Sequence, residues 1–282
     1  MKVGVLGAGL MGAEIALVFA LGGIDVILSD RDEAALERAV ARLATLLDKG
    51  VRRGSLAPER RRESLARIET SIDIARFADC ELVTEAVFES LEVKSTVLTE
   101  LDAVCRDDCV IASNTSTLPI STLGSAVSPA RRSRFIGTHF FSPVSRMALV
   151  EVITGFETDP QVAEWIVRLL GEIGKTPILI KDVAGFAVNR LLHAMLIEAV
   201  RLVEEGVASP EDLDTACRLG LGHPIGPFAL MDVVSSRLCL QVQTILHGAY
   251  GERFRPPALL KQRVAAGLGE GGKRPGWLKA ES

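Results

Sequence analysis

The sequence predicts an α/β protein in which a mainly parallel sheet with a protruding helical hairpin is followed by an all-helical C-terminal domain. Three observations predict this fold. Short apolar runs alternate with amphipathic helical segments up to about residue 182, as in consecutive β-α-β units. A long helical excursion interrupts this alternation after the second strand. From residue 184 onward no further strand pattern is evident. We therefore expect two domains, residues 1–182 and residues 183–282.

The composition excludes several classes of protein. With 282 residues, of which 48% are hydrophobic, the chain can bury two cores, and its net charge of −4 comes from interspersed acids and bases. Such a surface does not predict nucleic-acid or membrane binding. No apolar run reaches the roughly 20 residues that span a bilayer. The five cysteines lack C-x-x-C spacing, so we expect reduced thiols, no metal site and a cytoplasmic location.

The strongest binding signal lies at residues 7–12, which read G-A-G-L-M-G between an apolar strand and an apolar helix. A G-x-G-x-x-G turn in this context is the fingerprint of a Rossmann-type dinucleotide site. Gly7 allows the sharp turn, Gly9 lets a pyrophosphate approach the backbone, and Gly12 permits close packing of helix on strand. The residues expected at the cofactor here are Gly7, Gly9, Leu10, Met11 and Gly12.

An acidic residue after the second strand indicates which dinucleotide binds. The strand at residues 25–29 ends in Asp30, eighteen residues past Gly12. A carboxylate there can accept from both hydroxyls of an adenosine ribose, whereas a 2′-phosphate would meet its negative charge. The sequence therefore favours NAD over NADP. The neighbouring Arg31 is interpreted as packing on the adenine or facing solvent.

The helical excursion is rich in basic residues. A long amphipathic helix runs from Asp32 to about Arg53, and Pro58 opens a second helix, so we expect a hairpin that projects from the sheet. Its basic residues are Lys49, Arg52, Arg53, Arg60, Arg61, Arg62 and Arg67. Two interpretations remain open at this point. The basic residues form a solvent-exposed helix face, which is the commoner case, or they bind the phosphate groups of a phosphorylated part of the substrate.

Polar residues follow two further predicted strands. Glu89 and Lys94 come after the strand at residues 82–87, and the tetrad Asn114 to Thr117 follows the strand at residues 110–113. Open α/β sheets bind ligands at the carboxyl ends of their strands, so the tetrad is a candidate ligand site. Polar caps of an ordinary loop would give the same pattern.

One of the four histidines is the candidate acid–base group. His139 lies at the end of the strand predicted at residues 135–140, and Glu151 lies on the following strand. Removal of a hydroxyl proton during hydride transfer suits histidine, because its unperturbed pKa of about 6.5 leaves both protonation states accessible near neutrality. A carboxylate bonded to one ring nitrogen fixes the tautomer and stabilises the imidazolium. We therefore expect Glu151 to orient His139.

The C-terminal domain is predicted as helices at residues 186–205 and 210–219, and a third helical region at residues 227–246 with a break near Val234. Apolar positions spread widely around the first of these helices, which predicts burial on more than one side, as at the subunit interface of a homodimer. These positions are Leu191, Leu192, Met195, Leu196, Ala199 and Leu202. The glycine-rich tail at residues 267–276 predicts no regular element.

Longer runs of sequence resemble a known family. Residues 137–143 read G-T-H-F-F-S-P and are followed by Met147 and by Leu149-Val150-Glu151, a combination similar to the signature of the L-3-hydroxyacyl-CoA dehydrogenases, including short-chain 3-hydroxybutyryl-CoA enzymes. Residues 113–116, 182–190 and 220–227 resemble that family too. The resemblance covers nearly the whole chain in order, and it implies NAD as cofactor and an acyl-CoA as substrate.

The resemblance also implies roles for individual residues. His139 would be the general base with Glu151 as its partner, Ser116 and Asn189 would contact the substrate oxygen, Glu89, Lys94, Ser116 and Ser142 would lie at the cofactor, and the hairpin with Arg52 and Arg53 would receive the coenzyme A phosphates. Three features depart from the family pattern: Ser142 replaces a common Asn, Ser235-Ser236-Arg237 replaces Gly-Leu-Asp, and the tail around Lys273 only approximates the usual ending.

Two other functions fit parts of the pattern. The same scaffold serves dehydrogenases of free 3-hydroxy acids, such as gulonate or carnitine, and the arginine-rich hairpin favours coenzyme A over these. A protein that binds NAD(H) without catalysis would share the glycine turn. The presence of His139, Glu151, Ser116 and Asn189 favours an enzyme.

Overall fold

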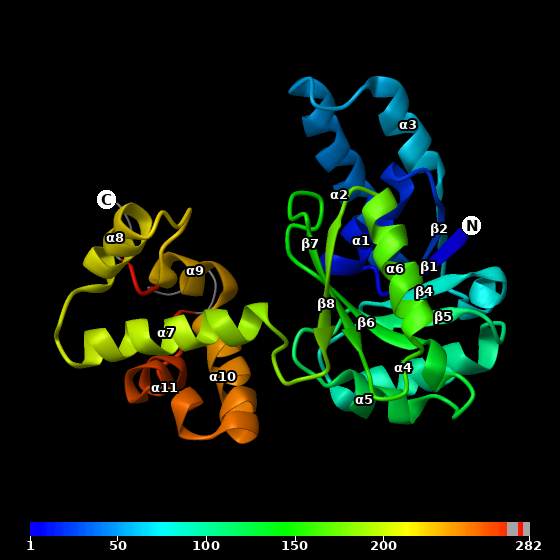
Figure 1. The fold of residues 1–282 in the computed structure, drawn as a ribbon. Coiled ribbons are helices and arrows are strands. Elements are labelled where there is room, and N and C mark those ends of the chain that lie inside the picture. The colour runs from blue at the N-terminus through cyan, green and yellow to red at the C-terminus, as the bar shows by residue number, and fades with distance from the viewer. Residues whose placement is uncertain (270–275, 279–282) are drawn as a thin grey trace. The chain divides into compact units, whose positions relative to one another are not determined.

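The computed structural model describes residues 1–269 and 276–278, and it divides into two compact units, Met1–Val183 and Ala184–Ser282. Each unit is described by itself. The first contains the sheet and the helical hairpin, and the second contains helices (Figure 1).

The first unit is built on one eight-stranded sheet with the order β3-β2-β1-β4-β5-β6-β7-β8. The first six strands in this order, from β3 to β6, are parallel to one another. They follow the 3-2-1-4-5-6 arrangement of dinucleotide-binding folds. Strand β7 runs antiparallel to β6, and β8 runs parallel to β7. The strands are β1 (Lys2–Leu6), β2 (Asp25–Ser29), β3 (Ile68–Ser71), β4 (Leu82–Glu85), β5 (Val110–Ser113), β6 (Phe135–Phe140), β7 (Leu149–Thr154) and β8 (Thr176–Lys181). The predicted fold class is confirmed.

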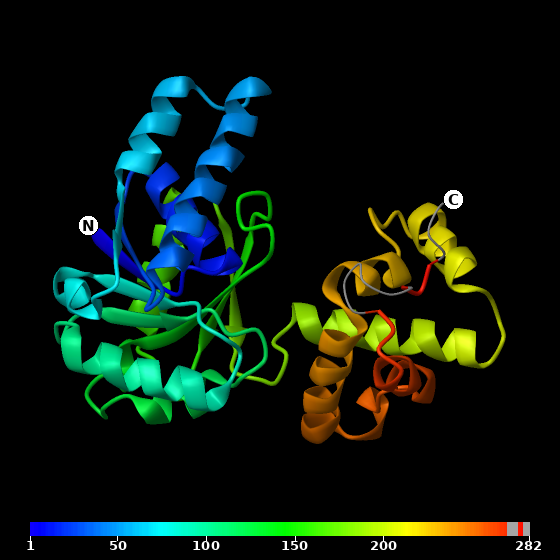
Figure 2. The ribbon, with the colours of Figure 1, turned by 180° about the vertical axis from the view of Figure 1, so that it is seen from behind.

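Helices cover both faces of this sheet. In Figure 1 α6 lies in front of the strands, and in the reverse view of Figure 2 α4 does. The helices α2 and α3 pack against each other and project beyond the sheet as the predicted hairpin. The helices of this unit are α1 (Leu10–Leu21), α2 (Glu33–Arg52), α3 (Pro58–Ala66), α4 (Leu91–Val104), α5 (Ile120–Leu123) and α6 (Pro160–Glu172), with short 3-10 helices at Ile74–Asp79, Gly124–Ala126 and Arg132–Arg134.

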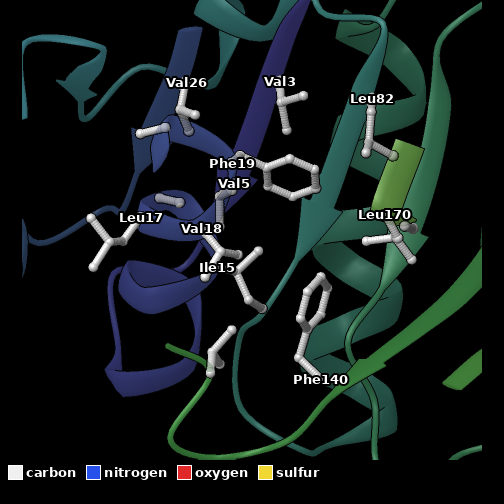
Figure 3. Close-up of a cluster of buried hydrophobic side chains, with 14 of the residues drawn as sticks. Val3, Val5, Ile15, Leu17, Val18, Phe19, Val26, Leu82, Phe140 and Leu170 are labelled. Carbon is white, nitrogen blue, oxygen red and sulfur yellow. The ribbon is translucent and has the colours of Figure 1, made fainter. Parts of the chain in front are cut away.

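The core between α1, α6 and the sheet is continuous and apolar (Figure 3). The Phe19 ring of α1 meets the Phe140 ring of β6 edge to face, with 6.5 Å between the ring centroids. Leu170 of α6 belongs to the same cluster. Because Phe140 follows His139 directly, this packing fixes the end of the strand that carries the candidate base.

Two local expectations for the first unit were wrong. Strand β3 was not predicted, because it is a partly exposed edge strand whose four residues include a single apolar one, Ile68. Helix α1 begins at Leu10, inside the glycine motif that we expected to precede the helix. Gly9 is its N-cap, so the second half of the glycine motif already forms the first helical turn.

The second unit is helical in its described residues. It contains α7 (Val188–Glu204), α8 (Pro210–Gly220), α9 (Pro227–Val234), α10 (Ser236–Tyr250) and α11 (Ala258–Ala265), with a 3-10 helix at Glu252–Phe254. The predicted break near Val234 is confirmed, since Ser235 has a φ of 85°. The first helix begins two residues later than expected, because the buried Phe186 has a φ of 46° and cannot start it.

The departure from the family pattern at residues 235–237 has a structural role. The Ser236 hydroxyl accepts a hydrogen bond of 2.9 Å from the indole N–H of Trp277, and the backbone N–H of Trp277 donates to Asp232. This arrangement attaches residues 276–278 to the core of the unit, where Trp277 contacts Phe228. Lys273 and most of the glycine-rich tail lie outside the described residues.

Within residues 1–269 and 276–278, no helix combines the length and apolarity that a membrane crossing requires. The same residues contain no cluster of three or more potential metal ligands. All five cysteines are free thiols.

Candidate active site

The parallel strands bring the candidate residues to one edge of the sheet. The last residues of β1, β4 and β5 lie side by side, with Leu6 paired to Glu85 and Glu85 paired to Ser113. Ser113 is in turn paired to Gly137 on β6, two residues before His139. The glycine turn and the polar tetrad therefore follow neighbouring strand ends, and the candidate base lies in the last two residues of the adjacent strand β6.

The glycine turn has room for a phosphate group. Gly7 has a φ of 105°, and a Cβ on Gly12 would lie 1.9 Å from the Gly7 carbonyl oxygen. In contrast, a Cβ on Gly9 would meet no atom within 4 Å. Within the described chain no side chain caps the N-terminus of α1. Open space in front of uncapped helix N–H groups fits a dinucleotide pyrophosphate.

The carboxylate of Asp30 reaches this turn. Its Oδ2 accepts a 2.8 Å hydrogen bond from the backbone N–H of Ala8, and its Oδ1 accepts from the N–H of Asp32. The acid therefore stands beside the glycine turn, as the fit to an adenosine ribose requires. The neighbouring Arg31 is exposed. The sequence did not indicate Arg42, whose guanidinium donates to the Gly9 carbonyl at 2.9 Å from a position 33 residues along the chain.

His139 and Glu151 form a buried pair across β6 and β7. The two residues are directly opposite in the register, and the His139 Nδ1 lies 2.8 Å from the Glu151 Oε2. Their side chains are 8% and 0% exposed. The Phe141 ring packs on the imidazole with 4.4 Å between ring centroids. Because Glu151 engages Nδ1, the other ring nitrogen, Nε2, faces away from the acid.

The loop that carries Ser116 is organised around Glu89. Five groups donate to a single oxygen of this side chain, Oε1: the backbone N–H groups of Ser116 and Thr117 and the hydroxyls of Thr115, Ser116 and Thr117, at 2.7–3.2 Å. Burial by itself raises the pKa of Glu89, but the Lys94 ammonium and these hydrogen bonds outweigh burial and lower that pKa.

Lys94 is buried, and its ammonium is directed to an acid that the sequence analysis did not select. The Lys94 Nζ lies 2.7 Å from the Glu85 Oε1 and 3.4 Å from the Glu89 Oε2. An acidic residue at the end of the apolar strand β4 is the signal that could have identified Glu85, since a buried carboxylate requires a partner.

Ser142 lies in a loop that the buried Glu14 and the half-buried Lys175 hold in place. The Glu14 carboxylate of α1 accepts from the Ser145 N–H at 2.9 Å, and the Lys175 ammonium donates to the Met147 carbonyl at 3.1 Å. Glu14 was missed in the sequence because it sits inside an apolar helix, 131 residues from its partner. Its position ties the Ser142 loop to the helix of the glycine turn.

The polar tetrad divides between two tasks. The Asn114 side-chain oxygen accepts from the backbone N–H of Phe140 at 2.9 Å, so Asn114 fixes the end of the strand that carries His139. The other three residues hold the Glu89 carboxylate. Part of the tetrad therefore supports the loop, as a polar cap would, and Ser116 remains the candidate for ligand contact.

The hairpin arginines also divide into two groups. Arg61, Arg62 and Arg67 form ion pairs with Asp48, Glu59 and Asp25. Lys49, Arg52 and Arg53, at the C-terminal end of α2, have no acidic partner among the described residues, and all three are exposed. Asn189, the remaining predicted residue, lies in the first turn of α7 in the second unit.

Fold and site together define an NAD-dependent dehydrogenase. The chain matches two family models, the NAD binding domain of 3-hydroxyacyl-CoA dehydrogenase at residues 2–183 and the C-terminal domain of 3-hydroxyacyl-CoA dehydrogenase at residues 185–279. It belongs to the 3-hydroxyacyl-CoA dehydrogenase family, and the predicted family, cofactor and enzyme class are confirmed.

Individual relatives agree with this assignment. A probable 3-hydroxybutyryl-CoA dehydrogenase of Deinococcus radiodurans is 41% identical over 271 residues, which cover 95% of this chain and 96% of the relative. The crystal structure of (S)-3-hydroxybutyryl-CoA dehydrogenase from Ralstonia eutropha has a TM-score of 0.94 at 37% identity and 99% coverage of both chains. A diketoreductase structure, described for dicarbonyl compounds, has a TM-score of 0.84 at 31% identity, also with 99% coverage of both.

The second and third glycines of the motif should respond differently to a methyl group. Gly12→Ala places a Cβ against the Gly7 carbonyl and should lower the free energy of unfolding by about 3 kcal/mol or more. Gly9→Ala meets open space, so its thermal midpoint should stay near that of the wild type while NADH affinity falls about tenfold. Thermal denaturation and NADH titration of both variants check this. Equal loss of stability in the two would contradict it.

The lowered pKa of Glu89 predicts an acid-sensitive loop. A carboxyl whose pKa is lower in the folded state contributes stability that is present above its unfolded pKa and is lost as the pH falls through the folded pKa. Between pH 5 and pH 3 the wild type should therefore lose more stability than Glu89→Gln, which cannot ionise there. Urea unfolding at several pH values measures the difference. Parallel pH profiles of wild type and variant would exclude this contribution.

Proposed function

We propose that the protein oxidises the C3 hydroxyl of an L-3-hydroxyacyl-CoA, or reduces the 3-oxo group in reverse, with His139 as general base and Glu151 as its partner. The observation that carries the proposal is the buried 2.8 Å contact between His139 Nδ1 and Glu151. Bound NAD supplies the hydride acceptor in this reaction. Nε2 of His139 takes the hydroxyl proton, and Glu151 stabilises the imidazolium that results.

Two further residues are proposed to contact the reacting oxygen. The bonds between Glu89 and the Ser116 loop support a fixed position for the Ser116 hydroxyl. Asn189 would contribute its amide from the helical domain. In the direction of reduction the Ser116 hydroxyl would turn its single hydrogen from Glu89 to the substrate oxygen, and with the Asn189 amide and the imidazolium it would stabilise that oxygen as negative charge develops.

The cofactor is proposed to lie along the glycine turn and the neighbouring strand ends. Open space at Gly9, the exposed side chain of Leu10 and the orientation of Asp30 support contacts with the pyrophosphate and the adenosine ribose. Glu89 and Ser142 would contact the nicotinamide half. Lys94 would act there through Glu89, because its own ammonium is buried against Glu85. The cofactor-contacting residues proposed at the turn are Gly7, Gly9, Leu10, Met11 and Gly12.

A short-chain acyl-CoA is the proposed substrate. The end of α2 is the proposed binding site for the coenzyme A phosphates. Three exposed cations there have no acidic partner in the described chain: Lys49, Arg52 and Arg53. The names of the relatives in Deinococcus and Ralstonia favour a four-carbon acyl group. The likeness to a diketoreductase favours a second candidate, a free carbonyl compound without coenzyme A.

We further propose that residues 1–182 bind the cofactor and that residues 183–282 bind substrate and form a homodimer. Large apolar side chains on the surface of the helical unit support the dimer: Leu191, Leu219, Leu221, Val233 and Leu238 are all exposed. A monomer in sedimentation of the intact chain would contradict it.

The thiols support a reducing, cytoplasmic compartment. Four of the five free cysteines are buried, and burial raises the pKa of Cys80 and of Cys239 to about 12. Such thiols stay protonated and behave as small apolar side chains.

Replacement of the base tests the mechanism. His139→Gln removes the proton acceptor, so turnover should fall about a hundredfold or more while NADH affinity stays nearly unchanged. Steady-state oxidation of NADH with acetoacetyl-CoA, together with NADH titration, measures both quantities. Retained turnover would remove His139 from this role.

Charge reversal at the end of α2 tests the substrate. The double variant Arg52→Glu, Arg53→Glu should raise KM for acetoacetyl-CoA about five- to tenfold and leave KM for a truncated thioester unchanged, because only the full substrate carries the phosphates. Arg168→Glu on α6, which is also exposed, is the control. An equal effect on both thioesters would indicate a solvated face. Better turnover of free 3-oxo acids by the wild type would favour the second candidate.

A further inference from the structure

Two cysteines outside the proposed active site lie side by side under a surface turn. Cys105 directly follows α4 and Cys109 directly precedes β5, and the three residues between them, 106–108, are exposed. Cys105 is 6% exposed and Cys109 is fully buried. A hydrogen bond joins the two thiol groups. The pair therefore lies just below the surface, with its two sulfurs adjacent.

The buried side chain of Arg131 fixes the positions of both cysteines. Its guanidinium donates to the Cys105 carbonyl at 3.0 Å and to the Cys109 carbonyl at 2.6 Å. It also donates to two further carbonyls of the same turn and forms an ion pair with Asp102 of α4 at 2.9 Å. Because one planar group binds both ends of the turn, the two cysteines keep their relative position.

The two thiols differ in the ease with which they lose a proton. The hydrogen bond from Cys109 lowers the pKa of Cys105 and outweighs burial, which raises it. The Arg131 guanidinium adds to the lowering, and the Asp102 charge opposes it. The same hydrogen bond raises the pKa of Cys109, and burial adds to this effect. The single hydrogen of the Cys109 thiol can also turn to the Val110 carbonyl, 3.5 Å away. Cys105 is therefore the thiol that forms the nucleophilic thiolate, and Cys109 is its protonated neighbour.

A third sulfur, that of Cys80, lies near the pair but differs from it. Burial raises the pKa of Cys80 to about 12, and the charge of Cys105 adds to this effect, so its thiol stays protonated at neutral pH. Among the residues that the structure describes, no group of three or more histidine, cysteine or acidic side chains is arranged to hold a metal ion. The chemistry left to the pair is therefore that of a dithiol.

Burial limits the oxidants that reach this dithiol. A bulky disulfide such as oxidised glutathione must bring its sulfur against the attacking thiolate, which the 6% exposure of Cys105 does not allow. A hydroperoxide about as small as water does not meet this obstacle. Hydrogen peroxide also reacts with thiolates in preference to thiols, and Cys105 is the more readily ionised of the two.

We propose that Cys105 and Cys109 are a modification site at which a small hydroperoxide forms a reversible disulfide. The Cys105 thiolate attacks one oxygen of hydrogen peroxide, the O–O bond breaks, and Cys105 becomes a sulfenic acid. The hydroxide that leaves takes the proton of Cys109 and becomes water. The Cys109 thiolate then attacks the sulfenic sulfur, so that the S–S bond forms, the S–O bond breaks and a second hydroxide leaves. Two electrons pass from the sulfurs to the peroxide, and an external thiol reverses the change.

Peptide mapping of the intact, folded protein tests the proposal. The chain is treated with hydrogen peroxide, denatured and alkylated, and then cleaved with trypsin after Arg106, which separates the two cysteines into different peptides. We expect Cys105 and Cys109 to lose alkylation together and to appear as one pair of disulfide-linked peptides. Dithiothreitol should restore both thiols, and Cys80 and Cys239 should remain alkylated throughout.

Cys109→Ser is the matched variant, because serine keeps a hydrogen-bond donor for the Cys105 sulfur but cannot form a disulfide. Cys105 should then stop at the sulfenic acid, which dimedone labels. Cys217→Ser, which removes the half-buried thiol of α8, should leave the linked peptides unchanged. The pair precedes β5 and the proposed cofactor residues follow this strand, so oxidation should change NADH affinity less than about twofold.

Three results would overturn the proposal. The first is full alkylation of both cysteines at every peroxide dose at which the protein still binds NADH. The second is a disulfide from Cys80 to either member of the pair in place of the expected one. The third is oxidation that dithiothreitol does not reverse, which would indicate sulfinic or sulfonic acids. The mapping of the wild type needs no variant, so a folding defect in Cys109→Ser does not remove this test.

Discussion

The parallel register of the four central strands is the constraint on which the whole site depends. Because β1, β4 and β5 end in line and Ser113 is paired to Gly137 of β6, the residues that follow Leu6, Glu85 and Ser113 gather at the edge of the sheet where β6 carries His139. A one-residue slip in any of these pairings would turn its side chains to the opposite face. The apolar packing of Phe19 on Phe140 therefore stabilises the site as much as it stabilises the fold.

The edge of the sheet carries more buried charge than stability alone explains. Glu14, Glu85, Lys94 and Glu151 are nearly or fully buried, and apolar residues of similar size would avoid the cost of removing charges from water. Each of the acids instead holds a backbone or side-chain group that belongs to the site. Glu14 fixes the Ser142 loop, Glu85 fixes Lys94, and Glu151 fixes His139.

The sequence predicted the features whose residues lie close together in the chain or on consecutive strands. The glycine turn and Asp30 belong to one strand-helix-strand unit, and His139 and Glu151 are opposite each other because β6 and β7 are consecutive antiparallel strands. Two of the contacts that were missed join distant segments, Arg42 to Gly9 and Glu14 to Ser145. A single sequence carries no signal for such pairings when one partner lies in an apolar run. Strand β3 was missed for the opposite reason, because its exposure removes the apolar pattern.

The two buried acid–base pairs of the site differ in the chemistry that they allow. Histidine is the side chain that gains and loses a proton near neutral pH, so a His–Glu pair can accept a proton while its carboxylate stays in place. The Lys94–Glu85 pair contains no imidazole, and its hydrogen bonds hold the Val87 N–H and the Ser113 hydroxyl. The proposed proton transfer therefore belongs to the pair on β6 and β7, whereas the pair formed by β4 and α4 lies beside Glu89. Strand β5 lies between β4 and β6 in the sheet. Its last residue, Ser113, donates to Glu85, and the next residue, Asn114, accepts from the Phe140 N–H beside His139, so a displacement of this single strand would disturb both pairs.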